Sequence, residues 1–184
     1  MTLVRTVHRA ISGWMAILRG DSDWRSHFTL SRGGLYLALA VYLGAMLILL
    51  AVRTGGAILS DPLLMGTSLV LNALPVAALG ISVLLTGLVL RWPAPAAELM
   101  VPGTYALAMI MVLNVLLLLF PAYLANTGTA ILGVLIFRLG RTAWLLPSVS
   151  ALAFAVLTVV LLVGLPVALY MLTVPFGTAP PAQA

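Results

Sequence analysis

Few side chains in this chain could perform chemistry. There are two histidines, His8 and His27, four acidic residues and no cysteine. The carboxylates nearest to His27 in sequence are Asp21 and Asp23, which we interpret as caps of a short helix rather than metal ligands or an acid–base pair. No glycine loop for phosphate and no serine-centred motif is present. We therefore expect no catalytic residue, no cofactor and no metal, and a protein that is not an enzyme.

Two asparagines are the strongest polar features inside long apolar runs. Asn72 and Asn114 lie about 28 Å and about 24 Å along their helices from Arg91 and Glu98, so the two amides would sit at similar depths. We predict that they form an interhelical polar pair joined by a hydrogen bond. A polar patch lining a substrate path is the alternative.

These runs carry no charge over lengths that a soluble domain does not need. Twenty-nine residues separate Asp61 from Arg91, and thirty-nine separate Glu98 from Arg138. About 20 apolar residues cross a ~30 Å hydrocarbon core. With 63% hydrophobic and 7% charged residues, the composition predicts an all-α integral membrane protein.

The membrane domain is predicted to cover residues 31–172 and to form a bundle of five transmembrane helices. A single helix over 99–137 would be about 58 Å long, nearly twice the core thickness. Pro121 and the turn-forming residues 125–128 allow a reversal instead. The expected spans are about 35–52, 62–90, 99–120, 123–137 and 144–172, followed by a disordered tail at 173–184.

Arginine and tryptophan positions predict the orientation. Only Arg53 would lie outside if the N-terminus is cytoplasmic and the C-terminus periplasmic, as the positive-inside rule requires. Because lysine is absent and alanine, leucine, valine and glycine are abundant, we predict a multi-pass protein of a bacterial inner membrane. The expected cytoplasmic interface anchors are Arg91, Trp92, Arg138, Arg141 and Trp144.

Residues 1–30 are predicted to be a cytoplasmic N-terminal amphipathic segment. Apolar residues from Leu3 to Leu18 recur at helical spacing, which predicts an interfacial helix lying on anionic lipids of the bilayer. The residues expected to contact the membrane surface are Arg5, Arg9, Trp14, Arg19 and Trp24. A partner-binding helix is the alternative, and in either case we expect the spans to fold without residues 1–19.

The layout from Phe28 to Leu172 resembles the Yip1-domain family of five-span membrane proteins. The stretches most similar to bacterial members are Leu88-Val89-Leu90-Arg91, Val101-Pro102-Gly103-Thr104-Tyr105-Ala106 and Leu119-Phe120-Pro121. The resemblance implies a non-enzymatic role in membrane organisation or in binding other membrane proteins.

The function predicted from these features is that of an accessory, assembly or scaffold partner, acting on another membrane protein or on a homo-oligomer. The alternative is a small transporter or channel component for a neutral or hydrophobic solute. No ionisable residue lies deep in a predicted span, which disfavours transport of charged solutes. The net charge of +5 comes from arginines at predicted membrane edges, so we expect no nucleic-acid partner.

Overall fold

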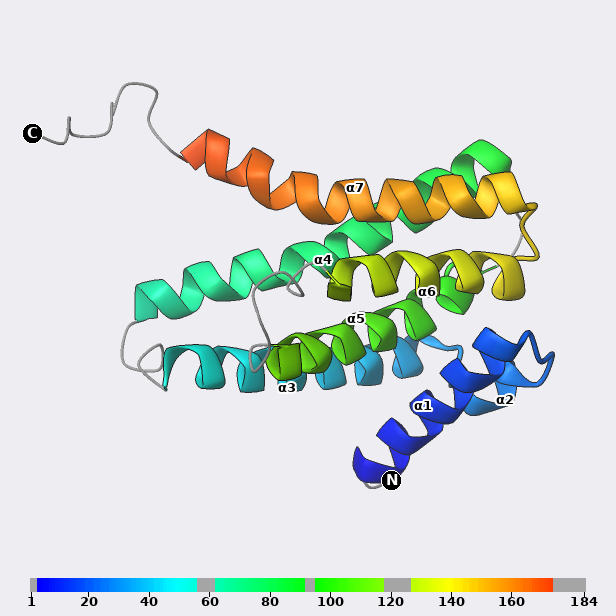
Figure 1. The fold of residues 1–184 in the computed structure, drawn as a ribbon, viewed down its shortest axis with the longest axis horizontal. Coiled ribbons are helices and arrows are strands. Elements are labelled where there is room, and N and C mark those ends of the chain that lie inside the picture. The colour runs from blue at the N-terminus through cyan, green and yellow to red at the C-terminus, as the bar shows by residue number, and fades with distance from the viewer. Residues whose placement is uncertain (1–2, 56–61, 92–94, 118–126, 174–184) are drawn as a thin grey trace, which may run out of the picture.

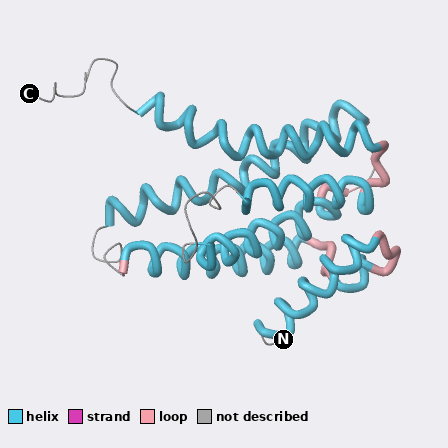
Figure 2. Tube along the Cα trace, in the orientation of Figure 1, coloured by secondary structure: helices cyan, strands magenta, loops and turns pink. Residues whose placement is uncertain are grey.

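The computed structural model describes residues 3–55, 62–91, 95–117 and 127–173. Figure 2 shows helices throughout these ranges. The connections that the structure describes are short turns. No strand occurs in them, and the prediction of an all-α protein is confirmed. The helices are α1 (Leu3–Arg19), α2 (Trp24–His27), α3 (Arg32–Thr54), α4 (Pro62–Leu90), α5 (Ala97–Leu117), α6 (Thr127–Ala143) and α7 (Ser148–Thr173).

Four of these helices are long and apolar enough to cross a membrane. The mean hydropathies of α3, α4, α5 and α7 are 2.5, 2.3, 1.9 and 2.7 over their candidate spans. Helix α6 has 17 residues, about 26 Å of helix against a ~30 Å core. The described residues therefore contain four candidate spans where five were predicted, and a fifth crossing would have to be made by α6.

The helix boundaries follow local signals. Helix α4 begins and ends at the predicted residues 62 and 90, whereas α6 continues to Ala143, beyond the predicted end at 137. Helix α7 starts at Ser148 instead of 144, because the carbonyl of Pro147 accepts the first bond of the helix, from the amide of Ala151. The predicted residues 118–120, 123–126 and 174–184 lie outside the described part of the chain.

The start of α3 requires a glycine at position 34. The Ser31 hydroxyl caps the helix by accepting a bond of 3.2 Å from the amide of Gly34. A Cβ added at Gly34 would lie 1.6 Å from the carbonyl oxygen of Thr29. Only glycine fits there, because any side chain would collide with the backbone that leads into the helix.

Successive long helices run in opposite directions. Helices α3, α5 and α7 run one way and α4 and α6 the other, and α1 and α2 lie at one end of this bundle (Figure 1). That end, which we call the arginine-rich end, holds the starts of α3, α5 and α7 and the ends of α4 and α6. Helix α5 packs against α3, α4 and α6, while α7 packs against α4 and α6.

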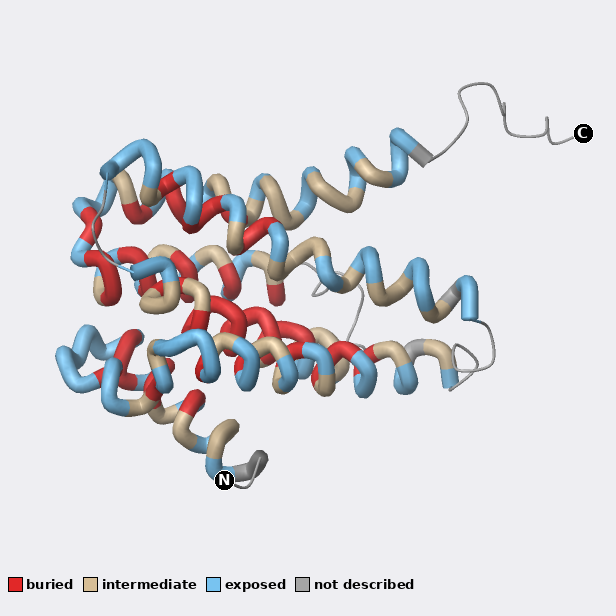
Figure 3. The backbone as a smooth tube through the Cα atoms, turned by 180° about the vertical axis from the view of Figure 1, so that it is seen from behind, coloured by how far each residue is buried: buried red, intermediate tan, exposed pale blue. Residues whose placement is uncertain are grey.

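Helix α5 is the centre of the bundle. In the most apolar stretch of α5, 61% of the residues are buried, compared with 17–22% in the other three candidate spans. Its small residues allow close approach: a Cβ at Gly103 would lie 2.7 Å from the Leu79 side chain of α4. Figure 3 shows this buried centre, with exposed residues along the outer faces of the surrounding helices.

The outer faces are apolar although they are exposed. Leu84 and Val89 of α4 are 62% and 79% exposed, and Val149 of α7 is 80% exposed. Soluble monomers rarely present large continuous apolar surfaces to water. Together with the hydropathy of the helices, this surface is that of a protein whose helices face lipid.

Candidate functional site

The arginine-rich end is the part of the molecule where helices, charges and hydrogen bonds converge. Among the described residues, Arg53 alone of the arginines lies toward the opposite end, near the end of α3 (Figure 1). Arg5, Arg19, Arg91 and Arg138 are exposed. They belong to three separate places in the chain, α1, the end of α4 and α6, and give this end of the bundle a positive charge.

Helix α1 packs against the bundle through buried side chains. Trp14 and Ile17 are 1% and 0% exposed. The indole Nε1 of Trp14 donates a hydrogen bond of 3.1 Å to the carbonyl of Pro102 in α5. The hydroxyl of Thr142 in α6 donates to the carbonyl of Ile17 at 3.4 Å. Helix α1 is therefore part of the protein core, which differs from the expectation that the spans need nothing from residues 1–19.

The burial of two tryptophans differs from the predicted membrane-surface contacts. Trp14 and Trp24 are each 1% exposed, so their rings face protein. The helical spacing of the apolar residues identified α1 correctly, but a single stripe cannot tell a lipid-facing side from a protein-facing one. Arg5 and Arg19 are exposed, and their contact with a membrane surface stays a prediction.

Helix α2 is held against α1 by close packing and one hydrogen bond. A Cβ at Gly13 would lie 2.5 Å from the Phe28 ring, so α1 needs glycine where α2 crosses it. Nη2 of Arg9 donates a bond of 2.8 Å to the carbonyl of Ser26. The Phe28 ring lies 5.9 Å from that of Tyr105, which ties this unit to α5.

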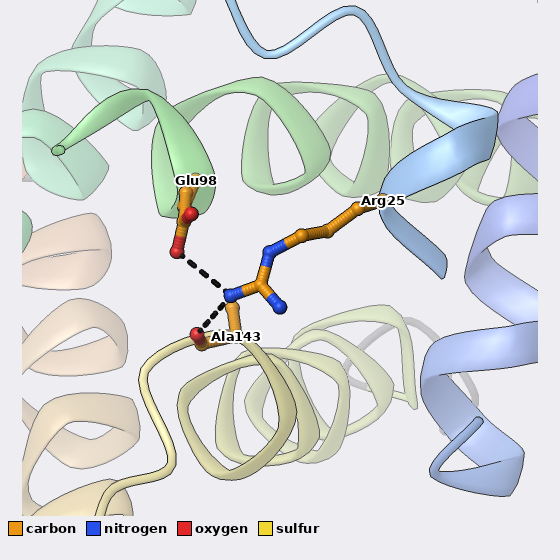
Figure 4. Close-up of polar contacts among 3 residues, drawn as sticks. All are labelled: Arg25, Glu98 and Ala143. Carbon is orange, nitrogen blue, oxygen red and sulfur yellow. Dashed lines mark hydrogen bonds and ion pairs between the residues drawn. The ribbon is translucent and has the colours of Figure 1, made fainter. Parts of the chain in front are cut away.

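Arg25 joins three helices at one point (Figure 4). Its Nη2 lies 3.2 Å from Oε2 of Glu98, at the start of α5, and 3.2 Å from the carbonyl oxygen of Ala143, the last residue of α6. The cation thus satisfies a helix C-terminus, and the carboxylate lies at a helix N-terminus, where the dipoles favour these signs. The Arg25 side chain is 50% exposed and that of Glu98 16%, so the pair is only partly screened by water.

Sequence reasoning missed this ion pair. From the sequence, Glu98 is predicted only to mark the edge of a span, and Arg25 only to lie on the cytoplasmic side. Glu98 is the only acidic residue between Asp61 and the C-terminus. Its isolation was the available signal that it has a specific partner.

The predicted interface anchors have different surroundings. Arg141 donates from Nη1 to the carbonyl of Leu146 at 3.2 Å and so closes the turn between α6 and α7. Trp144 is 2% exposed and packs near Gly87 of α4, which differs from a ring placed in lipid headgroups. Arg91 and Arg138 are exposed, and Trp92 lies outside the described residues.

The predicted pair of asparagines does not form. The amide of Asn72 donates to the carbonyl of Ser68 in its own helix at 2.8 Å, and its backbone carbonyl accepts a bond of 2.7 Å from the Tyr42 hydroxyl of α3. Asn114 faces α6, since a Cβ at Gly128 would lie 2.4 Å from its Oδ1. The two residues point toward different neighbours, and their equal depth stays a prediction.

No group of three or more potential metal ligands occurs among the described residues. The remaining chemistry of the arginine-rich end is that of cations, backbone carbonyls and apolar surface. Such an end can bind anions and apolar partners.

The fold and this end define an all-helical protein with four helices that can cross a membrane. No protein-family model, curated protein or solved structure matches the chain.

Proposed function

We propose that this chain is a non-enzymatic integral membrane protein of a bacterial inner membrane that serves as an accessory, assembly or scaffold partner. The observation that carries this proposal is the two-sided character of α1. One side is locked into the core by Trp14 and Ile17, while Ile11, Met15 and Leu18 on the other are 46%, 50% and 37% exposed. A helix already held in place loses little conformational entropy when a partner binds.

The surroundings of this stripe fit recognition of another protein at the membrane. The stripe of Ile11, Met15 and Leu18 lies among the exposed cations Arg5 and Arg19. Apolar surface with a polar rim is typical of interaction sites. The predicted resemblance to the Yip1-domain family also favours a non-enzymatic role in membrane organisation.

We further propose five crossings, with the N-terminus cytoplasmic and the C-terminus periplasmic. Helix α6 supports this topology because it runs antiparallel to both α5 and α7 and carries Arg138 and Arg141 to the arginine-rich end (Figure 1). In this cysteine-free chain, Thr127→Cys and Leu145→Cys mark the two ends of α6. An impermeant thiol reagent should label Thr127→Cys from the periplasm and Leu145→Cys only after the membrane is opened. Labelling of both from one side would exclude the fifth crossing.

The alternative, a small transporter or channel component for a neutral or hydrophobic solute, has less support. Buried hydroxyls inside the spans donate to carbonyls of their own helices: Ser82 to Ala78 at 2.6 Å and Thr158 to Phe154 at 2.8 Å. Hydroxyls engaged in this way do not line a polar path.

The scaffold proposal is tested by a charge placed on the stripe. Met15→Glu should release a membrane protein that co-purifies in native lipid discs with the unmodified chain, as measured by quantitative mass spectrometry. Ser22→Glu is the matched control, because it adds the same charge at an exposed position between α1 and α2, away from the stripe. The same proteins recovered with both variants, or none with the unmodified chain, would contradict the proposal.

A further inference from the structure

An apolar groove of about 470 Å³ lies between α1, α3 and α5. Val7 and Ile11 of α1 form one wall, and Gly44 and Ile48 of α3 form another. A Cβ added at Gly44 would meet no atom within 4 Å, so the groove is open at that point. Its lining is apolar except for the hydroxyl of Tyr105.

The groove has the length of one membrane leaflet. On α5 its lining extends from Tyr105, near the arginine-rich end, to Leu116. These eleven helical steps correspond to about 16 Å, or about half of the ~30 Å hydrocarbon core. An acyl chain that starts at the arginine-rich end would therefore run along the groove within a single leaflet.

A polar recess adjoins the groove at the arginine-rich end. The two cavities share Ala10 and Tyr105, and the recess is also lined by Arg5, Arg9 and His27. Its volume of about 20 Å³ has room for about one water molecule, so a larger anionic group would sit at its mouth.

The charges around the recess favour an anion. No carboxylate lines it, and Glu98, the nearest acid along α5, is paired with Arg25. Arg9 directs Nη2 to the carbonyl of Ser26, which holds the guanidinium in place without neutralising its charge. Arg5 is exposed, so it can reach a phosphate at the surface.

We infer that the recess and the groove together bind one phospholipid with a net negative headgroup. The phosphodiester lies at the mouth of the recess beside Arg5 and Arg9, and one acyl chain lies in the groove between α1, α3 and α5. Basic pockets between helices at the cytoplasmic side bind anionic headgroups by this chemistry. The inference rests on the proposed membrane orientation but not on the proposed protein partner.

The test is native mass spectrometry of the purified full chain, titrated with phosphatidylglycerol or with phosphatidylcholine of the same acyl chains. The unmodified chain should retain phosphatidylglycerol more tightly. Arg5→Gln should weaken phosphatidylglycerol binding about fivefold, the effect of one cation near an anionic headgroup, and leave phosphatidylcholine unchanged. Arg19→Gln is the matched control, an exposed arginine of α1 that does not line the recess.

A second variant tests the acyl-chain site separately. Gly44→Leu fills the open part of the groove without a collision of its Cβ and replaces a helical glycine by a better helix former. It should fold at least as stably, yet weaken binding of both lipids about tenfold, as expected when two methylene groups can no longer be buried. Gly66→Leu in α4, where a Cβ also meets no atom within 4 Å, should bind lipid like the unmodified chain.

Each of the following outcomes would overturn the inference. Equal binding of both lipids, or a preference that Arg5→Gln leaves intact, would remove the headgroup site. Unchanged binding in Gly44→Leu would remove the acyl-chain site. A dimer in the same spectra that Gly44→Leu dissociates would assign the groove to a second copy of the chain. Competition by free glycerol phosphate would assign the recess to a soluble anion. Because lipid retention and protein co-purification are separate measurements, failure of this inference is distinguishable from failure of the scaffold proposal.

Discussion

The two ends of the bundle differ in how their helices are held. In α4, five residues between 78 and 86 are buried, whereas none of those described between 62 and 77 is. Helix α7 repeats the pattern, with four buried residues between 151 and 158 and none between 159 and 172. In these two outer helices the buried residues therefore lie in the half nearest the arginine-rich end (Figure 3), whereas the buried residues of α3 continue to Leu49.

This difference has a physical origin. The described part of α5 extends to Leu117 and that of α6 starts at Thr127, and the contacts described for these two central helices lie toward the arginine-rich end (Figure 1). The distal parts of α4 and α7 have mainly outward-facing apolar residues, which lipid can cover at no cost. A membrane protein can thus be rigid at one end and loosely packed at the other without exposing apolar surface to water.

Truncating a buried tryptophan is the strongest test of the difference in packing between the two ends. Trp14→Ala should lower the free energy of unfolding by about 3–5 kcal/mol, because it removes a fully buried ring and leaves a cavity. Leu172→Ala, at a residue that is 82% exposed, should change it by less than about 0.5 kcal/mol. Denaturant titration in mixed micelles measures both.

A conservative change at the same residue separates packing from hydrogen bonding. Trp14→Phe keeps most of the ring but loses the hydrogen bond to the Pro102 carbonyl. It should lower the free energy of unfolding by about 1 kcal/mol. If Trp14→Ala costs no more than Leu172→Ala, α1 is not part of the core and the spans do fold independently of it.

Replacing glycine by alanine should change the free energy of unfolding in opposite directions at the two ends. Gly34→Ala should destabilise by about 1–3 kcal/mol, because its Cβ would collide with the carbonyl of Thr29. Gly66→Ala, near the start of α4, meets no neighbour and should stabilise by up to about 1 kcal/mol through helix propensity. Thermal unfolding in detergent gives both signs, and equal effects would show that packing at the two ends is alike.

A double-mutant cycle on Arg25 and Glu98 measures the ionic link at the arginine-rich end. We expect a coupling of about 0.5–1 kcal/mol that falls as salt is added, because Arg25 is half exposed. Arg25→Gln alone should lower the free energy of unfolding more than Glu98→Gln alone, since Arg25 also donates a hydrogen bond to the carbonyl of Ala143. Arg19→Gln combined with Glu98→Gln is the control and should show no coupling.

The smallest effect is expected from the two asparagines. Asn72→Leu and Asn114→Leu should be additive within about 0.5 kcal/mol, because each amide faces a different neighbour. Chemical unfolding of the two single variants and the double variant measures this. A coupling well above that limit would restore the interhelical pair.

The sequence predicted the helices well, because their signals are local. Long uncharged runs limit the choice to helices that can cross a membrane, and α4 starts at the predicted Pro62. Helix α3 starts at Arg32, after its cap Ser31, instead of at the predicted residue 35. The predicted end of α6 at residue 137 is wrong, because two arginines after it predict the end of a span, whereas the helix continues to Ala143.

Only the tertiary structure decided which residues meet. Trp14 and Trp24 are of the residue type that anchors helices at a membrane interface, yet they are buried in protein. Asn72 and Asn114 were predicted to pair, yet they face different neighbours. The reason is that lipid and protein interior are equally apolar, so hydrophobicity does not select the face that a membrane helix turns toward its neighbours. That choice depends on shape and on single polar partners, such as the carbonyl of Pro102, which accepts from Trp14, and the carbonyl of Ala143, which accepts from Arg25.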